Sequence, residues 1–214
     1  MKLASKMFAL TALAVACSAA SAQQTAPLTV TGNITPPACT ASMSNDGAFK
    51  YADTDASSLN DTTTTSLPNS RTATFNISCL SAAQVAWTIV DNRQDSSYLT
   101  SDTGYLGLGK DSDGNKIGSY LVRMSQPFLD GAAAYAMRST NNGATWAYLE
   151  RANYIMRPAN LYSYSKTGNA NTLDKGSVFS ANIVVYPTIA PKSTLNTSNA
   201  IDMDGSATIN LSYL

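Results

Sequence analysis

The chain of 214 residues has no histidine, only three cysteines and a single glutamate, Glu150. Without histidine, catalytic triads and most general acid–base sites lose their usual base. With one glutamate, the paired carboxylates of a glycosidase are harder to supply. No CxxC motif and no phosphate-binding glycine loop ahead of a helix is present. An aspartate-only or Ser-Lys site has no positive support, so we expect no enzyme, no metal ligand and no cofactor.

The chain also has no excess of charge of either sign. Charged residues make up 13% of the chain, and 14 Lys and Arg balance 14 Asp and Glu. This balance argues against nucleic acid or an anionic membrane surface as a partner. We expect a partner with a polar, mostly uncharged surface, and no membrane span in the mature chain.

The N-terminal residues are typical of a signal peptide. Two lysines precede an apolar stretch at residues 7–16, and residues 20–22 (ASA) provide an AxA-like cleavage site. The apolar stretch is too short to be a spanning helix. Residues 1–22 are therefore predicted to be cleaved after Sec export, which leaves residues 23–214 as a single domain.

Removal of this leader takes Cys17 and leaves Cys39 and Cys79. In an exported protein an isolated pair of cysteines is most simply one disulfide. A reactive thiol or a metal site is the weaker alternative, since the chain lacks histidine and CxxC. A lipoprotein attached through Cys17 is also less favoured, because Ala14 stands where a lipobox usually has leucine.

Past the leader, short alternating segments bounded by Gly, Asn, Asp, Ser and Pro predominate, and no helix-period run is convincing. This pattern is typical of an all-β, antiparallel sandwich. The expected strands are residues 28–34, 49–51, 73–79, 85–89, 104–109, 117–124, 132–138, 145–151, 178–186 and 206–214.

Two segments are expected to lie outside regular structure. Residues 46–71 read as a polar, Thr-rich connector around the short strand at 49–51, and residues 162–175 as a mobile insertion. Pro187 and Pro191 are expected to end the late strand, because proline cannot donate to a β-ladder.

The last segment, residues 206–214 (SATINLSYL), alternates small or polar residues with Ala207, Ile209, Leu211 and Tyr213. A period of two gives a strand one apolar face. Leaving the three largest of these side chains in water would forgo about 5 to 8 kcal/mol of burial. We therefore expect this face to be covered.

Three motifs invite functional interpretations. Residues 111–115 (DSDGN) could bind calcium, but a hairpin loop is favoured, because Lys116 and Val122 occupy positions where an EF-hand needs Gly and Glu. Residues 139–146 (STNNGATW) resemble the Asp-box, a hairpin device of sialidases. A sugar-binding surface is a minority hypothesis for the tyrosines. These are Tyr120, Tyr135, Tyr148, Tyr154, Tyr162 and Tyr164.

The leader, the GNITPPAC segment, the second cysteine on a core strand and the alternating final strand together resemble subunits of bacterial chaperone–usher fimbriae. Within that group, the chain looks most similar to a GltF-like, fimbrial-type family of unestablished function. The closer match is to residues 91–93 (DNR), 106–109 (LGLG), 117–120 (IGSY), 186–191 (YPTIAP) and 204–209 (DGSATI).

The resemblance implies an immunoglobulin-like, pilin-type sandwich that lacks its last strand, with Gly32 and Cys39 on the first strand and Cys39 bonded to Cys79. It implies that a periplasmic chaperone, then a neighbouring subunit delivered through an usher, adds the missing strand beside the C-terminal one. The matching recognition residues are Gly205, Ala207, Ile209, Leu211 and Tyr213.

The resulting first hypothesis is a non-enzymatic fimbrial subunit, located in the periplasm and then in a surface fimbrium, with a role in adhesion. The short segment QQTAPLTV ahead of Gly32 favours acceptance of a strand over donation. The alternatives are a tip adhesin of the same fold that binds a surface glycan, and a self-contained periplasmic protein that does not polymerise. A secreted hydrolase is a distant fourth.

Overall fold

The computed structural model describes residues 29–33, 38–68, 70–149 and 154–214. The predicted leader, residues 1–22, lies outside the described residues. By its contacts the chain divides into two units, Met1–Thr35 and Pro36–Leu214. In the first unit, the described residues 29–33 are exposed and form no strand. The fold described below is that of the second unit.

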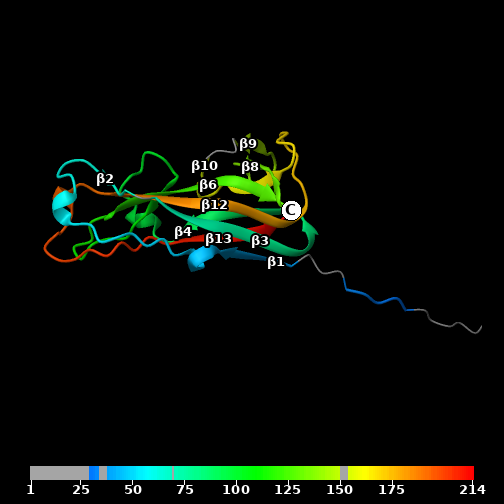
Figure 1. Cartoon of the computed structure of the whole chain (residues 1–214), viewed down its shortest axis with the longest axis horizontal. Helices are drawn as coiled ribbons and strands as arrows, with labels where there is room; N and C mark the ends of the chain where they lie inside the picture. Colours follow the sequence, from blue (N-terminus) through cyan, green and yellow to red (C-terminus); the bar gives the residue numbers. More distant parts are fainter. Residues whose placement is uncertain (1–28, 34–37, 69, 150–153) are drawn as a thin grey trace, which may run out of the picture. The chain divides into compact units, whose positions relative to one another are not determined.

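Two antiparallel sheets form a β-sandwich, as the sequence pattern predicts (Figure 1). The first sheet has the order β1-β3-β12-β6-β10, with β2 paired to β12 and with β5 and β7 paired to β6. Its strands are β1 (Cys39–Met43), β2 (Thr65–Ser66), β3 (Arg71–Ala83), β5 (Tyr105–Gly107), β6 (Gly118–Leu129), β7 (Ala132–Ala133), β10 (Tyr154–Ile155) and β12 (Gly176–Ile189).

The second sheet has the order β13-β4-β11-β8-β9. Its strands are β4 (Val85–Asp91), β8 (Tyr135–Ser139), β9 (Ala147–Leu149), β11 (Leu161–Ser165) and β13 (Ala207–Tyr213). Short 3-10 turns occur at Ser44–Gly47, Ala56–Ser58, Gln94–Ser96 and Lys192–Thr194. Over the ranges that the structure describes there is no α-helix, and hence none that could cross a membrane.

The core lies between the sheets and is centred on Trp87 of β4, which is fully buried. The Trp87 ring meets the Tyr164 ring edge-on, with 4.9 Å between centroids, and also packs against Phe75 and Phe179. Aromatic pairs in this edge-to-face geometry add stabilisation beyond their buried area. The alternating residues of β3 and β12 therefore meet those of β4 and β11 around one aromatic cluster.

Most of the predicted strands are confirmed. Residues 73, 75, 77 and 79 are buried along one face of β3, and residues 85, 87 and 89 along one face of β4. The two predicted hairpins correspond to the antiparallel pairs β5–β6 and β8–β9. Two expected N-terminal strands are wrong. Residues 29–33 of the first form no strand, with residues 28 and 34 outside the described part, and residues 49–51 form none either.

The expected mobile insertion at residues 162–175 is wrong at its beginning, because β11 is an inner strand of the second sheet. In this strand the residues 162–165 (YSYS) are all buried, including both serines. Ser163 Oγ donates to the Val85 carbonyl at 2.8 Å, and Ser165 Oγ accepts the Gly168 N–H at 3.1 Å. Hydrogen bonds of this kind let serine be buried at little cost.

Pro187 does not end the late strand, which continues to Ile189. The Pro187 carbonyl accepts the Leu67 N–H at 3.1 Å, on the side of β12 that faces β2. The ring nitrogen of Pro187 points to that same side, where β3 has already ended with the pair Val185 and Arg71. No ladder hydrogen bond with β6 is lost, so proline is tolerated at this edge-like position.

Candidate functional site

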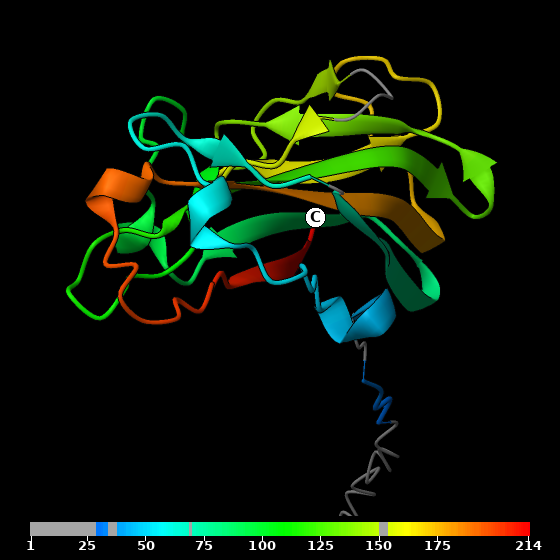
Figure 2. The ribbon, with the colours of Figure 1, turned by 60° about the vertical axis from the view of Figure 1, so that its left-hand side comes forward.

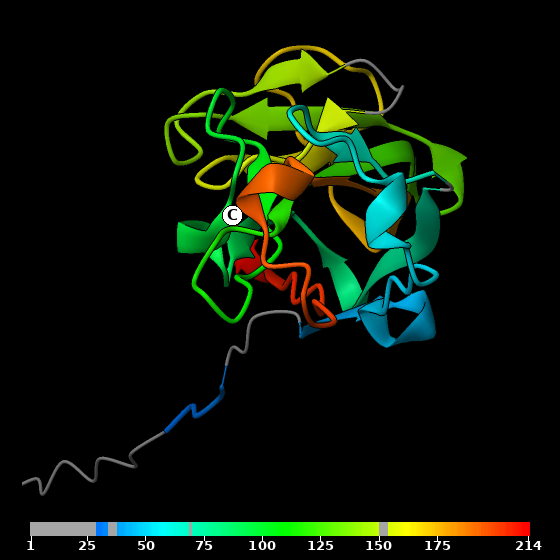
Figure 3. The ribbon, with the colours of Figure 1, turned by 90° about the vertical axis from the view of Figure 1, so that its left-hand side faces the viewer.

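The candidate site is a groove on the side of the sandwich where each sheet has an edge strand. β1 is an edge of the first sheet and β13 an edge of the second. Figures 2 and 3 show the blue β1 and the red β13 on the same side of the sandwich. Between them lies a groove of about 1310 Å³ that side chains of both strands line. The sandwich is therefore open along this side.

The floor of the groove is apolar, and its two walls are largely irregular chain. One wall consists of β1 and residues 46–54, and the other of residues 197–203 and the start of β13. Charged side chains at the rim include Lys50, Asp53 and Asp202, all exposed. The floor is made of core side chains from both sheets: Phe75, Ile89, Val122, Ile183, Val185 and Ile189.

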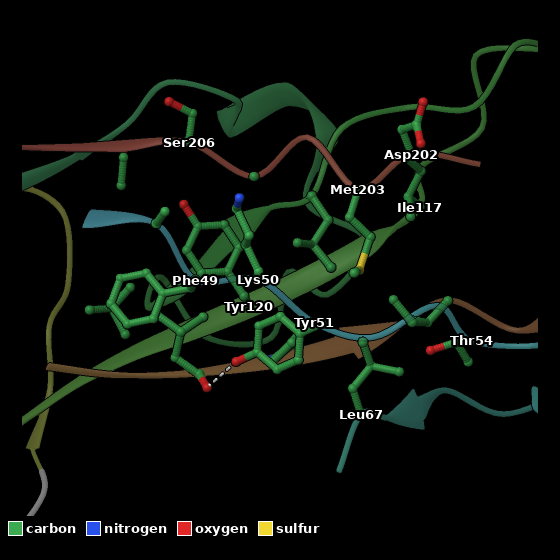
Figure 4. A pocket seen from close by; sticks show the side chains of 18 of the residues that line it. Phe49, Lys50, Tyr51, Thr54, Leu67, Ile117, Tyr120, Asp202, Met203 and Ser206 are labelled. Carbon is green, nitrogen blue, oxygen red and sulfur yellow. Dashed lines mark hydrogen bonds between the residues drawn. The ribbon is translucent and has the colours of Figure 1, made fainter. Parts of the chain in front are cut away.

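Residues 46–54 are held against the sandwich by Tyr51. The Tyr51 hydroxyl donates to the Val185 carbonyl at 2.7 Å, as Figure 4 shows within the pocket. The Arg71 guanidinium, whose Nε donates to the Lys50 carbonyl at 3.0 Å, also lies over the Tyr51 ring. Residues 46–54 were expected to be part of a simple connector, yet their side chains line the groove.

Among the described strands, none pairs with the outer edge of β13. The Asn92 N–H donates to the Ser206 carbonyl and the Leu214 N–H to the Gln84 carbonyl. Because residues of an antiparallel strand bond to a given neighbour alternately, the even-numbered residues of β13 bond to β4. The odd-numbered residues direct their N–H and C=O groups away from β4, and no described residue bonds to them. They are Ala207, Ile209, Leu211 and Tyr213.

The apolar face of β13 is covered only in part. Ile209 and Leu211 are half-buried against the core, whereas Ala207 is exposed and Tyr213 is 47% exposed. We predicted that the apolar face of β13 is covered. The described residues cover it only in part and leave the groove open beside it.

One end of the groove is closed by a contact between the two edge strands. The Tyr213 hydroxyl on β13 accepts the backbone N–H of Cys39 at 2.7 Å. Cys39 lies directly opposite Cys79 on the neighbouring strand β3, and the predicted disulfide between them is present. Gly32, which the resemblance places on the same strand as Cys39, is not in a strand.

At the other end, Gly205 lies two residues before β13 and packs closely against Tyr120 and Leu108. A Cβ atom at Gly205 would lie 3.0 Å from Tyr120 Cε1 and 3.1 Å from Leu108 Cδ2. The same turn is fixed by the ion pair between Arg93 Nε and Asp204 Oδ2 at 2.8 Å. A small residue is therefore required for the close approach of this turn to the sandwich.

The motifs DNR and LGLG, singled out by resemblance, meet beneath that turn. Asp91 is buried, and its carboxylate accepts the Arg93 and Gly107 N–H groups, both at 2.8 Å. Ser96 Oγ donates to the Arg93 carbonyl and accepts the Gly109 N–H. The Asp91 carboxylate and the Ser96 hydroxyl thus both bond to groups within these two motifs and the turn between them. The motifs therefore position the chain ahead of β13 and do not form a binding site of their own.

The predicted chaperone-recognition residues are thus brought together along one side of the groove. Ala207 and Ile209 line it directly, Gly205 fixes one end, and Tyr213 contacts β1 at the other. Leu211 packs against the core from the same strand face.

The tyrosines do not form a common sugar-binding surface. Four of the six are buried in the core: Tyr120, Tyr154, Tyr162 and Tyr164. Tyr148 is 43% exposed, and its ring meets that of the half-buried Tyr135 at 5.4 Å. Of the predicted set, Tyr148 on β9 is therefore the tyrosine with an exposed ring.

The loop at residues 111–115 is a hairpin turn held by Asp111. The Asp111 carboxylate accepts backbone N–H groups of Asn196, Asn115 and Asp113. These hydrogen bonds, that of Asn196 foremost, lower the pKa of Asp111 to about 2. Across the described residues, no group of three or more Cys, Asp or Glu side chains is placed to hold a metal ion.

The STNNGATW segment forms the turn between β8 and β9, as predicted. Asn141 Oδ1 accepts the Thr145 N–H at 2.9 Å, and the Trp146 indole donates to the Gly143 carbonyl at 3.1 Å. Trp146 is buried on the outer face of the second sheet beside Ala86 and Met137. The motif is structural.

Over the described residues, the fold and groove define a β-sandwich with an edge strand beside an open groove. The sequence comparisons name no activity. Residues 28–106 match the family model described as Protein of unknown function (DUF1120). Protein GltF of Escherichia coli (strain K12) is 26% identical over 227 residues, covering 87% of each chain. The Uncharacterized protein YhcF of the same strain is 25% identical over 207 residues, covering 83% of this chain and 85% of the relative.

Proposed function

We propose that this protein is an exported, non-enzymatic subunit of fimbrial type that accepts a β-strand from another polypeptide. The donor is first a periplasmic chaperone and then a neighbouring subunit delivered through an usher. The observation that supports this proposal most directly is the free edge of β13 above an apolar groove.

A strand laid beside β13 would satisfy the free groups of that edge. Each odd-numbered residue from 207 to 213 presents one N–H donor and one C=O acceptor to the added strand. Main-chain bonds of this kind provide affinity when a peptide extends a sheet, while alternate side chains entering pockets provide specificity. The donor should therefore alternate, with apolar side chains facing the floor of the groove.

An exposed strand edge is also a liability for a free protein. Unpaired edges template pairing with other chains and lead to aggregation unless they are covered. A dedicated donor resolves this problem by covering β13 from the moment of folding. This is the physical reason to expect a chaperone rather than a stable free monomer.

The periplasm and then the cell surface are the proposed locations. The predicted leader and the Cys39–Cys79 disulfide both suit an oxidising compartment outside the cytoplasm. We propose acceptance rather than donation, because the short segment QQTAPLTV, between the predicted cleavage site and Gly32, is interrupted by Pro27.

Site-specific photocross-linking tests the proposal. The chain with its own leader is expressed together with a chaperone–usher chaperone, and a photoreactive residue replaces Asn210 on the exposed face of β13. We expect a one-to-one cross-link whose partner peptide, identified by mass spectrometry, is an extended strand of the chaperone.

The matched control places the same residue at Val90, which is 41% exposed on the neighbouring strand β4 and so one strand further from the donor. It should cross-link far less. A chain that purifies as a monodisperse, fully stable monomer and forms no cross-link from position 210 would overturn the proposal in favour of a self-contained periplasmic protein.

A second candidate function, a tip adhesin that binds a surface glycan, has one supporting observation. Tyr148 and Tyr135 form an aromatic pair at the surface, and exposed aromatic rings can stack on sugars. Glycan-array binding that is lost in Tyr148→Ala, with strand acceptance unchanged, would favour this function. Binding that is absent from the parent chain would remove it.

A further inference from the structure

We propose that Tyr120 makes the groove selective for a strand that carries an uncharged hydrogen-bonding side chain, such as Ser, Thr or Asn, at the position facing it. This inference rests on the proposed strand-acceptor function and adds a requirement on the sequence of the donor. Tyr120 lies on β6, lines the groove and is 6% exposed.

The hydroxyl of Tyr120 has no hydrogen-bond partner among the residues that the structure describes. The other tyrosines buried in the core each have one. Tyr154 donates to Met124 Sδ, Tyr162 to the Ile155 carbonyl and Tyr164 to the Ser180 carbonyl. The Tyr120 ring is buried, but its hydroxyl oxygen is not among the fully buried polar atoms that lack a partner, so it still meets water in the groove. A strand laid over the groove would remove that water, and buried hydroxyls are paired in the great majority of native structures.

The position of Tyr120 shows where its partner must come from. Its Cε1 atom, next to the carbon that bears the hydroxyl, lies 3.0 Å from the place of a Cβ on Gly205. The hydroxyl end of the ring is thus at the Gly205 end of the groove, and Figure 4 shows Tyr120 in the middle of the side chains that line the pocket. A strand laid along β13 would extend past this point.

The Tyr120 hydroxyl is uncharged and can donate a hydrogen bond. Burial, together with the nearby Asp91 carboxylate, raises the pKa of the Tyr120 phenol above its usual value, so the proton stays on the oxygen at any physiological pH. A donor strand that is apolar at every inward position would exclude water from this hydroxyl and leave it unpaired. An acceptor side chain at that position avoids the penalty.

The cost of leaving one buried hydroxyl unpaired corresponds to roughly a tenfold or larger loss of affinity. A polar side chain facing any other part of the floor, which is made of apolar side chains such as Phe75, Ile89 and Val185, should weaken binding instead. The groove should therefore prefer a polar side chain at only one position of the donor strand, the one that faces Tyr120.

A peptide scan tests the inference. The mature chain is refolded with fluorescent peptides of about a dozen residues that have valine at every inward position, and with variants that have asparagine at one inward position at a time. We expect one asparagine variant, near the peptide end that lies beside Gly205, to bind about tenfold tighter than the all-valine parent. Asparagine elsewhere should bind more weakly.

The variant Tyr120→Phe, which keeps the ring, should remove the preference at that single position and leave the others unchanged. Tyr148→Phe, on the exposed pair outside the groove, should behave as the parent chain. Peptides that bind without any preferred asparagine position, or a preference that survives in Tyr120→Phe, would overturn the inference and leave strand acceptance standing. Failure of every peptide to bind would instead count against strand acceptance itself.

Discussion

The hydroxyl of Tyr213 on β13 accepts a hydrogen bond from the backbone N–H of Cys39 on β1, with 2.7 Å between the oxygen and the nitrogen. These strands are edges of different sheets, and this bond joins them at the end of the groove where the disulfide lies. The opening of the sandwich is therefore bounded: closed by this contact at one end and by the Gly205 turn at the other.

Tyr213→Phe removes the acceptor of this contact and keeps the ring. We expect the free energy of unfolding to fall by about 0.5 to 1.5 kcal/mol, the usual net value of one hydrogen bond. Urea denaturation of the mature chain in complex with its strand donor measures the change. Tyr148→Phe, whose ring is exposed outside the groove, is the control, and an equal loss in both variants would contradict the role given to the Tyr213 hydroxyl.

Reduction of the disulfide should lower the free energy of unfolding by about 4 kcal/mol, because the bond closes a loop with a sequence separation of 40 residues. The measurement compares urea denaturation with and without a reductant. In the double variant Cys39→Ser, Cys79→Ser the reductant should have no further effect. A parent chain whose stability is insensitive to the reductant would show that β1 is held by its other contacts alone.

Gly205→Val should destabilise the chain by about 1 to 3 kcal/mol, because its side chain would press on Tyr120 and Leu108. It should also weaken strand binding, since the turn that leads into β13 must move. Gly32→Val is the matched control, because a Cβ there meets nothing within 4 Å. Thermal denaturation of both variants measures the difference, and equal midpoints would contradict the close packing of Gly205.

Acid should destabilise the fold through Asp111. The pKa of its carboxyl is lowered in the folded chain from an ordinary 3.8 to about 2 by hydrogen bonds, first from the Asn196 N–H. The stabilisation is therefore complete above about pH 4 to 5 and is lost as the pH falls toward 2. Asp111→Asn should show a smaller drop in melting temperature over that interval than the parent chain.

The control for this pH series is Asp95→Asn, because the exposed Asp95 side chain takes part in no hydrogen bond among the described residues. It should retain the pH dependence of the parent chain. If Asp111→Asn and the parent chain lose stability equally between pH 4 and pH 2, the carboxylate of Asp111 does not hold the loop to Asn196.

The strands that could be predicted were those in which apolar side chains occupy every second position. β3 and β4 alternate clearly, and the disulfide followed from two cysteines in a chain predicted to be exported. β11 was missed because its buried positions include Ser163 and Ser165, whose hydroxyls find partners only in the folded chain. A hydrophobicity pattern contains no information about such partners.

Only the β13 side of the groove could be predicted from the sequence. Ile209 and Leu211 mark β13 as a strand whose apolar face needs cover, and this much is readable from alternation. Residues 46–54 and 197–203 form walls of the groove without any regular period, so nothing in the sequence placed them there. In the sequence, Tyr120 looks like any other strand tyrosine. Only the lack of a hydrogen-bond partner in the described part of the chain distinguishes it from the other core tyrosines.

The most direct test of strand acceptance is amide hydrogen exchange resolved residue by residue along β13, before and after a donor strand is bound. In the free chain, the amides of Ile209 and Leu211 should exchange much faster than that of Asn210, which bonds to β4. Binding of the donor should protect Ile209 and Leu211 and change Asn210 little. Amides of Ile209 and Leu211 that are already protected in a stable free monomer would contradict the account.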